Sequence, residues 1–193
     1  MAEVRPLIKY DLNRDVHTAQ VMASQLDPFV YENETYGGMP DDLPKLTIGG
    51  LLMRLHRLSL LDMLLSDEQR EALEKAHQQV GNVKREWLTA YTNKIMHELT
   101  LHINQWNQLL NECGQDQDEC REMYSSVVEK RVMAQVLTDE ARKLNVLTPE
   151  IEKQLHGIDS QVQGYFTAGS FIWDQRLQSA YPQDQYGFLY VTI

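Results

Sequence analysis

The stretch Thr47–Leu65, TIGGLLMRLHRLSLLDMLL, decides how this chain folds. Its leucines cover more than one face of a helix, and Arg54, Arg57 and Asp62 are the only charged residues among them. Because a helix that is apolar nearly all round belongs in the centre of a bundle, we predict a buried core helix here. Thr47 is a suitable N-cap residue for this helix. The charged residues argue against a membrane-spanning segment.

Two long helices are expected after the central one. Ser66 and Gln69 match the capping-box pattern at the start of a helix over residues 66–113. The apolar stripe of this helix keeps its phase across Gly81, which favours an elongated bundle over a kink at the glycine. A short polar turn then leads into a helix over residues 117–145. A connection this short implies an antiparallel hairpin.

The flanking segments complete the predicted fold. Residues 13–26 are expected to form the first helix, which ends before Pro28. Residues 28–46 combine prolines and glycines with aromatic side chains, so we expect an irregular loop that wraps over the surface. A fifth helix is expected over residues 148–182, with Pro149 at its first position, where proline is tolerated.

These elements together predict an all-α protein, an elongated antiparallel helical bundle of about five helices. A chain of 193 residues, of which 42% are hydrophobic, is long enough to form one domain with its own core. We expect an N-terminal helix and wrapping loop over residues 1–46 and a bundle core over residues 47–180. An aromatic tail follows over residues 181–193.

The charge of the chain restricts its partners. Acidic residues outnumber basic ones, 28 to 18, and the formal net charge is −10. Such a surface repels the phosphates of nucleic acids and anionic lipid headgroups, so we expect neither nucleic acid nor membrane as a partner. Residues 1–10 contain no apolar stretch of the length found in signal peptides, and a cytoplasmic location is the resulting expectation.

The chain contains two cysteines, Cys113 and Cys120. In a reducing compartment both are expected to be free thiols. Their spacing would also allow a disulfide across a helical hairpin if the compartment were oxidising. Two thiols are too few for a structural zinc site, which needs four ligands.

Helical bundles are common hosts of metal sites, so glutamates and histidines at ligand spacing are the first candidates for a functional site. A dinuclear iron site needs Glu-x-x-His on two helices, and this spacing occurs here at Glu74–His77 alone. A looser set of glutamates and histidines lies on two predicted helices and can meet across a hairpin. It consists of His97, Glu98, His102, Glu152 and His156. The competing interpretation is a set of solvated ion pairs on the helix surfaces.

A second candidate site is an anion site at the start of the central helix. Backbone N–H groups at a helix N-terminus can bind a phosphate or carboxylate, and Gly49 and Gly50 lie there. Arg54 and Arg57 follow within two turns. In the competing interpretation, the glycines permit a tight helix crossing and the arginines form salt bridges at the rim of the bundle.

The third candidate is the aromatic C-terminus, because aromatic side chains are favoured at protein interfaces. Its candidate interaction residues are Phe171, Trp173, Tyr186, Phe188 and Tyr190. Either they form a docking strip for a partner or a second subunit, or the tail folds back as a cap over the bundle end.

No catalytic motif stands out, so the sequence favours a non-enzymatic interaction or scaffold protein without a cofactor, plausibly a homodimer. Its partner is expected to be a protein, bound through the C-terminal strip, the 28–46 loop or an exposed groove of the bundle. The alternative is an enzyme or sensor with a metal or small ligand held by histidine and glutamate between helices.

Overall fold

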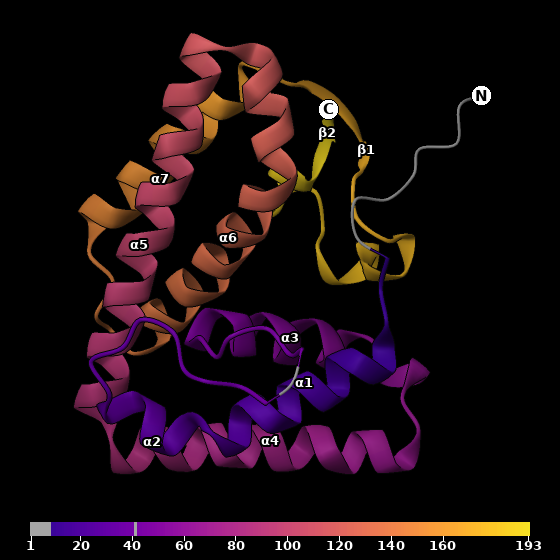
Figure 1. The fold of residues 1–193 in the computed structure, drawn as a ribbon, viewed down its shortest axis with the longest axis vertical. Helices are drawn as coiled ribbons and strands as arrows, with labels where there is room; N and C mark the ends of the chain where they lie inside the picture. Colours follow the sequence, from indigo (N-terminus) through magenta and orange to yellow (C-terminus); the bar gives the residue numbers. More distant parts are fainter. Residues whose placement is uncertain (1–8, 41) are drawn as a thin grey trace.

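The structure is a computed structural model that describes residues 9–40 and 42–193, and its described part is all-α apart from a two-stranded sheet (Figure 1). The helices are α1 (Leu12–Ser24), α2 (Leu26–Tyr31), α3 (Ile48–Leu60), α4 (Asp67–Glu86), α5 (Leu88–Gln115), α6 (Gln117–Lys143) and α7 (Pro149–Gln163). The short 3₁₀ helices are η1 (Asp62–Leu64), η2 (Gln175–Ala180) and η3 (Gly187–Leu189), and the strands are β1 (Thr167–Phe171) and β2 (Tyr190–Thr192). The predicted all-α class is confirmed, although the chain divides into more helices than expected.

The helices form two groups. In Figure 1, α1, α2, α3 and α4 lie together in the lower part, and α5 and α6 rise from them as a hairpin with α7 alongside α5. The central helix α3 packs on α1, α4, α5 and α6, as its apolar surface predicts. It therefore joins the two groups, together with the contacts that α2 and α4 make with α5.

The helix expected over residues 66–113 is interrupted, but not at its glycine. The capping box of Ser66 and Gln69 is present, and α4 continues through Gly81 to Glu86. The backbone leaves the helical conformation at Trp87, whose ring meets that of Tyr31 edge to face at 4.5 Å. This contact between distant residues accompanies the turn from α4 to α5, and the prediction of one long helix was wrong.

The α5–α6 hairpin is present and is closed by a disulfide. Asp116 caps α6, accepting hydrogen bonds from the backbone N–H groups of Asp118 and Glu119. Cys113 and Cys120 lie on either side of this turn, are buried and form a disulfide bond. The expectation of free thiols was therefore wrong, and the alternative of a stapled hairpin is what the structure contains.

The N-terminal region is more helical than expected. Helix α2 runs through Pro28, because this proline lies in the first turn, where no backbone N–H is needed for the helix. The segment after Tyr31 is irregular and lies against α5. Lys94 of α5 donates hydrogen bonds to the backbone oxygens of Glu32 and Glu34, at 2.6 and 2.8 Å. The first helix ends close to the expected place, at Ser24, but the separate short helix α2 was not predicted, and the irregular loop begins only after it.

The last predicted helix ends much earlier than residue 182. Helix α7 stops at Gln163, and β1 and β2 then pair as antiparallel strands, with Ala168 opposite Val191. A β-prone C-terminus cannot form a sheet without a partner strand, and residues 167–171 provide one. The pairing draws these residues out of the helix that local apolar spacing had indicated.

The C-terminal segment is fastened to the helices by its own polar groups. The hydroxyl of Tyr124 on α6 donates to the backbone oxygen of Phe188 at 2.5 Å, and within the segment Tyr190 donates to the backbone oxygen of Tyr181 at 2.7 Å.

Of the described helices, none has the length and apolar character that crossing a membrane requires. The single-domain organisation stays a prediction.

Loss of the disulfide should measurably weaken the fold. Replacing Cys113 and Cys120 by serine should lower the free energy of unfolding by about 2–3 kcal/mol, because the bond closes only a short loop and restricts the unfolded chain modestly. Chemical denaturation with and without dithiothreitol provides the measurement. Reductant should destabilise the wild-type protein and leave the double variant unchanged, and an equal response of both proteins would contradict the prediction.

Candidate functional site

The first turn of α3 already holds a carboxylate that belongs to this chain. The backbone N–H groups of Ile48 and Gly49 donate to the two oxygens of Glu98 at 2.8 and 2.9 Å, and Gly50 N–H donates to the hydroxyl of Thr47 at 2.9 Å. The positive end of the helix dipole favours this negative charge. The predicted anion position at Gly49 and Gly50 thus exists as geometry, and Glu98 of α5 fills it.

Gly49 is the residue that permits this approach. A Cβ atom at Gly49 would lie 2.6 Å from Glu98 Oε1 and 3.0 Å from Leu137 Cδ1. Glu98 is also bonded to His102, whose Nε2 lies 3.2 Å from Oε1. Both side chains are buried. The pair therefore joins α5 to the start of α3.

Arg54 and Arg57 bind a different carboxylate. Arg57 grips Asp15 of α1 with two hydrogen bonds, one of them from Nε at 2.6 Å, and Arg54 Nε lies 3.3 Å from the same carboxylate. Burial lowers the pKa of Arg54. Burial also acts to lower the pKa of Arg57, but hydrogen bonding to Asp15 and the electrostatic attraction of its neighbours together outweigh burial, so the pKa of Arg57 is raised. These three charges form an internal ion cluster between α1 and α3, so the arginines lie apart from the carboxylate at Gly49.

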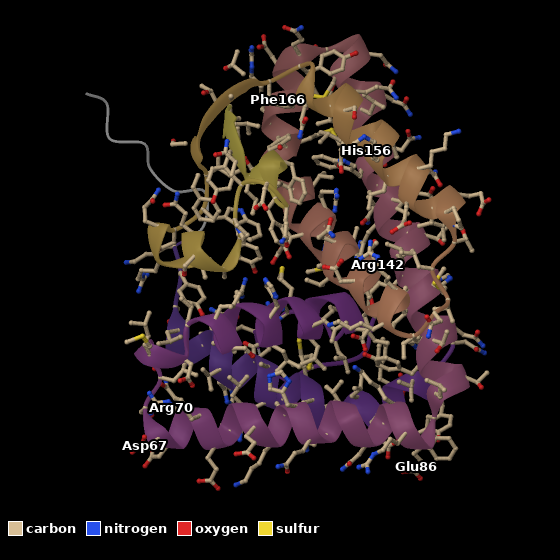
Figure 2. The ribbon with its side chains drawn as sticks, turned by 180° about the vertical axis from the view of Figure 1, so that it is seen from behind. Asp67, Arg70, Glu86, Arg142, His156 and Phe166 are labelled. Carbon is tan, nitrogen blue, oxygen red and sulfur yellow. A yellow bond between two sulfur atoms is a disulfide. The ribbon has the colours of Figure 1, made fainter. Side chains whose placement is uncertain are left out.

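The five predicted metal ligands do not converge. Glu98 and His102 lie together in the core, His97 is exposed, and Glu152 pairs with Arg142 at 2.7 Å. His156 lies one turn further along α7, on the exposed side (Figure 2). Across residues 9–40 and 42–193, no group of three or more histidine, cysteine, aspartate or glutamate side chains is arranged to hold a metal ion.

The aromatic residues of the C-terminus are buried within the chain. The exposed fractions of Phe171, Trp173, Tyr186, Phe188 and Tyr190 are 3%, 1%, 1%, 3% and 8%. Tyr186 meets Phe188 edge to face at 5.9 Å, and the carbonyl of Phe188 is bonded to Tyr124. These rings cap the helices, and a docking strip would need side chains that are more accessible.

A groove that the sequence analysis missed lies between α3, α4 and α6. Its volume is about 440 Å³. Each helix contributes one stripe at helical spacing: Leu52, Leu55, His56, Ser59 and Leu60 from α3; His77, Val80, Gly81 and Lys84 from α4; Val136, Asp139, Glu140 and Lys143 from α6. The signal was present in α3, where a histidine and a serine interrupt the leucines on one face.

The polar groups of the groove are paired with one another and with the backbone. His77 Nε2 lies 3.1 Å from the hydroxyl of Ser59, which also bonds to the backbone oxygen of Leu55. Burial and the nearby Lys84 lower the pKa of His77, which favours the neutral form of its ring. Lys84 is itself paired with Glu140. Because both Ser59 and His77 lie inside helices, neighbouring backbone N–H groups are engaged and do not form an oxyanion hole.

Known proteins give no guide to the function of these sites. No protein-family model matches the chain, and neither a curated protein nor a solved structure matches it.

The close approach of Glu98 to Gly49 leads to a specific prediction. Gly49→Ala should lower the free energy of unfolding by about 1–3 kcal/mol, because the added methyl group displaces Glu98. Gly157→Ala is the matched control, since a Cβ there meets nothing within 4 Å among the described residues and alanine favours a helix. Urea denaturation of both variants measures the difference. Equal stability of the two variants would contradict the proposed role of Gly49.

Proposed function

We propose that this chain is a non-enzymatic interaction module that binds a basic, apolar segment of a partner protein in the groove between α3, α4 and α6. The observation that carries the proposal is the continuity between the apolar wall of the groove and an exposed apolar ridge, defined as Leu60, Met63 and Leu64. Leu60 belongs to both.

The three apolar side chains of the ridge are exposed to solvent to an extent that is unusual for large apolar residues. Leu60, Met63 and Leu64 have exposed fractions of 54%, 94% and 55%. Single exposed apolar side chains are common on proteins, whereas a group of them beside a groove is typical of an interaction site. Burying them against a partner would contribute roughly 25 cal/mol for each Å² of apolar surface removed from water.

The charges beside the ridge favour a basic partner. Figure 2 shows Asp67 and Arg70 at the end of α4 that adjoins the ridge, and Glu86 at its other end. The acidic residues of this region are Asp62, Asp67, Glu68, Glu71 and Glu74, and its basic residues are Arg70 and Lys75. Complementary charge speeds association and excludes wrong partners. The same excess of acid, with a net charge of −10, supports a protein partner over nucleic acid or an anionic membrane.

The missing side chain at Gly81 leaves space in the groove, which supports the proposal that the groove takes up a bound segment. It lies in the interior of α4, where glycine costs about 1 kcal/mol relative to alanine. A Cβ atom at Gly81 would meet nothing within 4 Å among the described residues, so packing does not require glycine. Accommodation of a bound segment is a physical reason for the missing side chain.

The ridge can be tested with a defined probe. We expect a fluorescein-labelled synthetic peptide of leucine and lysine, spaced as an amphipathic helix, to bind the wild-type protein in a fluorescence-anisotropy titration. Replacing Leu60, Met63 and Leu64 by serine should weaken binding about tenfold or more, because the apolar anchors are lost. Leu88→Ser is the control, since Leu88 is 52% exposed beyond the far end of α4.

Two results would contradict this proposal. One is equal binding by the triple variant and the Leu88→Ser variant. The other is equal binding of a leucine–glutamate peptide with the same apolar spacing. Native mass spectrometry of the same samples tests the homodimer, and a dimer that the triple variant abolishes would identify a second copy of the chain as the occupant.

The groove itself is tested by filling it. Gly81→Leu should abolish peptide binding and slightly raise the melting temperature, because leucine favours the helix and enters open space. Gly157→Leu should raise the melting temperature similarly and leave binding intact, since Gly157 lies in α7, away from the groove. Differential scanning calorimetry and the same anisotropy titration supply both measurements. Unchanged binding by Gly81→Leu would exclude the groove.

A further inference from the structure

A second recess lies away from the groove, between α6, α7 and residues 183–188. Its volume is about 350 Å³, at the lower end of the range typical of small-molecule sites. Helix α7 packs on α5, and ion pairs connect it to α6. Arg131 binds Asp159 near one end of the recess, and Arg142 binds Glu152 near the other. Polar side chains, and not an apolar seam, therefore face each other across it.

Arg131 is the buried cation of this recess, with 3% of its surface exposed. Its Nε and Nη2 donate to the carboxylate of Asp159 at 2.8 and 2.7 Å, and Nη2 also lies 3.1 Å from Gln135 Oε1. The guanidinium carbon lies 4.4 Å from the centre of the Phe188 ring. Within the described part of the chain, Nη1 has no hydrogen-bond acceptor. A buried donor without an acceptor is unfavourable, but Nη1 has almost no exposed surface, so the accessible polar groups around it are the ones that can contact a ligand.

The balance of charge in the recess does not favour an anion. Two guanidinium groups, of Arg131 and Arg142, face three carboxylates, of Glu152, Asp159 and Asp184. The other polar groups are mainly amides, with two hydroxyl groups and one imidazole: Gln135, Thr138, His156, Ser160, Gln163, Gln183 and Gln185. These groups offer both donors and acceptors, and only a ligand group with both capacities satisfies them together.

We propose that this recess binds a neutral polyhydroxylated molecule, a sugar or polyol of about one or two rings. A hydroxyl group accepts from a glutamine amide and donates to the carboxylate of Asp184 or a glutamine oxygen. A carboxylate or phosphate ligand would satisfy the donors but would be repelled by the three acids. The site is separate from the groove, and it needs neither a metal nor a protein partner.

The test uses the whole protein and named probes. Isothermal titration calorimetry with glucose, trehalose and myo-inositol, and with the charged analogues glucuronate and glucose 6-phosphate, measures the preference for neutral ligands. Nuclear magnetic resonance of the ¹⁵N-labelled protein locates the site through the side-chain amides of Gln135, Gln163 and Gln183. We expect at least one neutral probe to bind more tightly than both charged analogues and to shift these amide signals.

Matched variants separate the recess from the rest of the surface. Gln163→Ala should weaken binding of the neutral probe by about three- to tenfold, because one hydrogen bond is lost. Gln154→Ala, which removes an exposed glutamine of α7 outside the recess, should leave binding unchanged. The proposal is overturned if no neutral probe binds, if a charged analogue binds more tightly, or if both variants bind equally.

Discussion

Helix α3 can be buried only because its polar groups find partners in other helices. A charge or backbone N–H group removed from water is costly unless it is paired. Glu98 of α5 accepts hydrogen bonds from the first turn of α3, and Asp15 of α1 pairs with both Arg54 and Arg57. These two carboxylates position α1 and α5 relative to α3. The two groups of helices therefore depend on ion pairs and cap hydrogen bonds as well as on the leucines around them.

The C-terminal segment closes the structure by the same rule. Tyrosine rings supply apolar area, but their hydroxyl groups need partners when they are buried. Tyr124 and Tyr190 both donate to backbone oxygens of the segment that follows β1, and His56 of α3 meets the oxygen of Ala180 at 2.9 Å. Burial raises the pKa of Tyr181 to about 12, and its hydroxyl is an exception to this rule, because it has no hydrogen-bond partner among the described residues. The aromatic residues thus complete the core of this chain.

The two recesses arise where helices face each other without a continuous apolar seam. In the groove, a histidine and a serine of α3 face His77 and Lys84 of α4, and the glycine between them leaves space. In the smaller recess, the ion pair of Arg131 and Asp159 connects α6 and α7, and polar side chains line the space beside it. Polar stripes on helices are readable in a sequence, but which stripes meet depends on how the helices pack. For this reason the sequence indicated a ligand site at Arg54 and Arg57, which in the structure form ion pairs with Asp15. It gave no indication that Gly81 and Arg131 line recesses.

The sequence by itself determined the helical class, the central place of α3 and the local signals at helix ends. Thr47, the Ser66–Gln69 capping box and Asn145, with a left-handed φ of 57° after α6, act within one turn of the chain. Tertiary structure decided where helices break and which charges pair. The turn at Trp87 involves Tyr31, and the end of α7 involves strand β2. These helix ends depend on residues that are far apart in the sequence and come together only when the core packs. The local spacing of apolar residues therefore could not predict them.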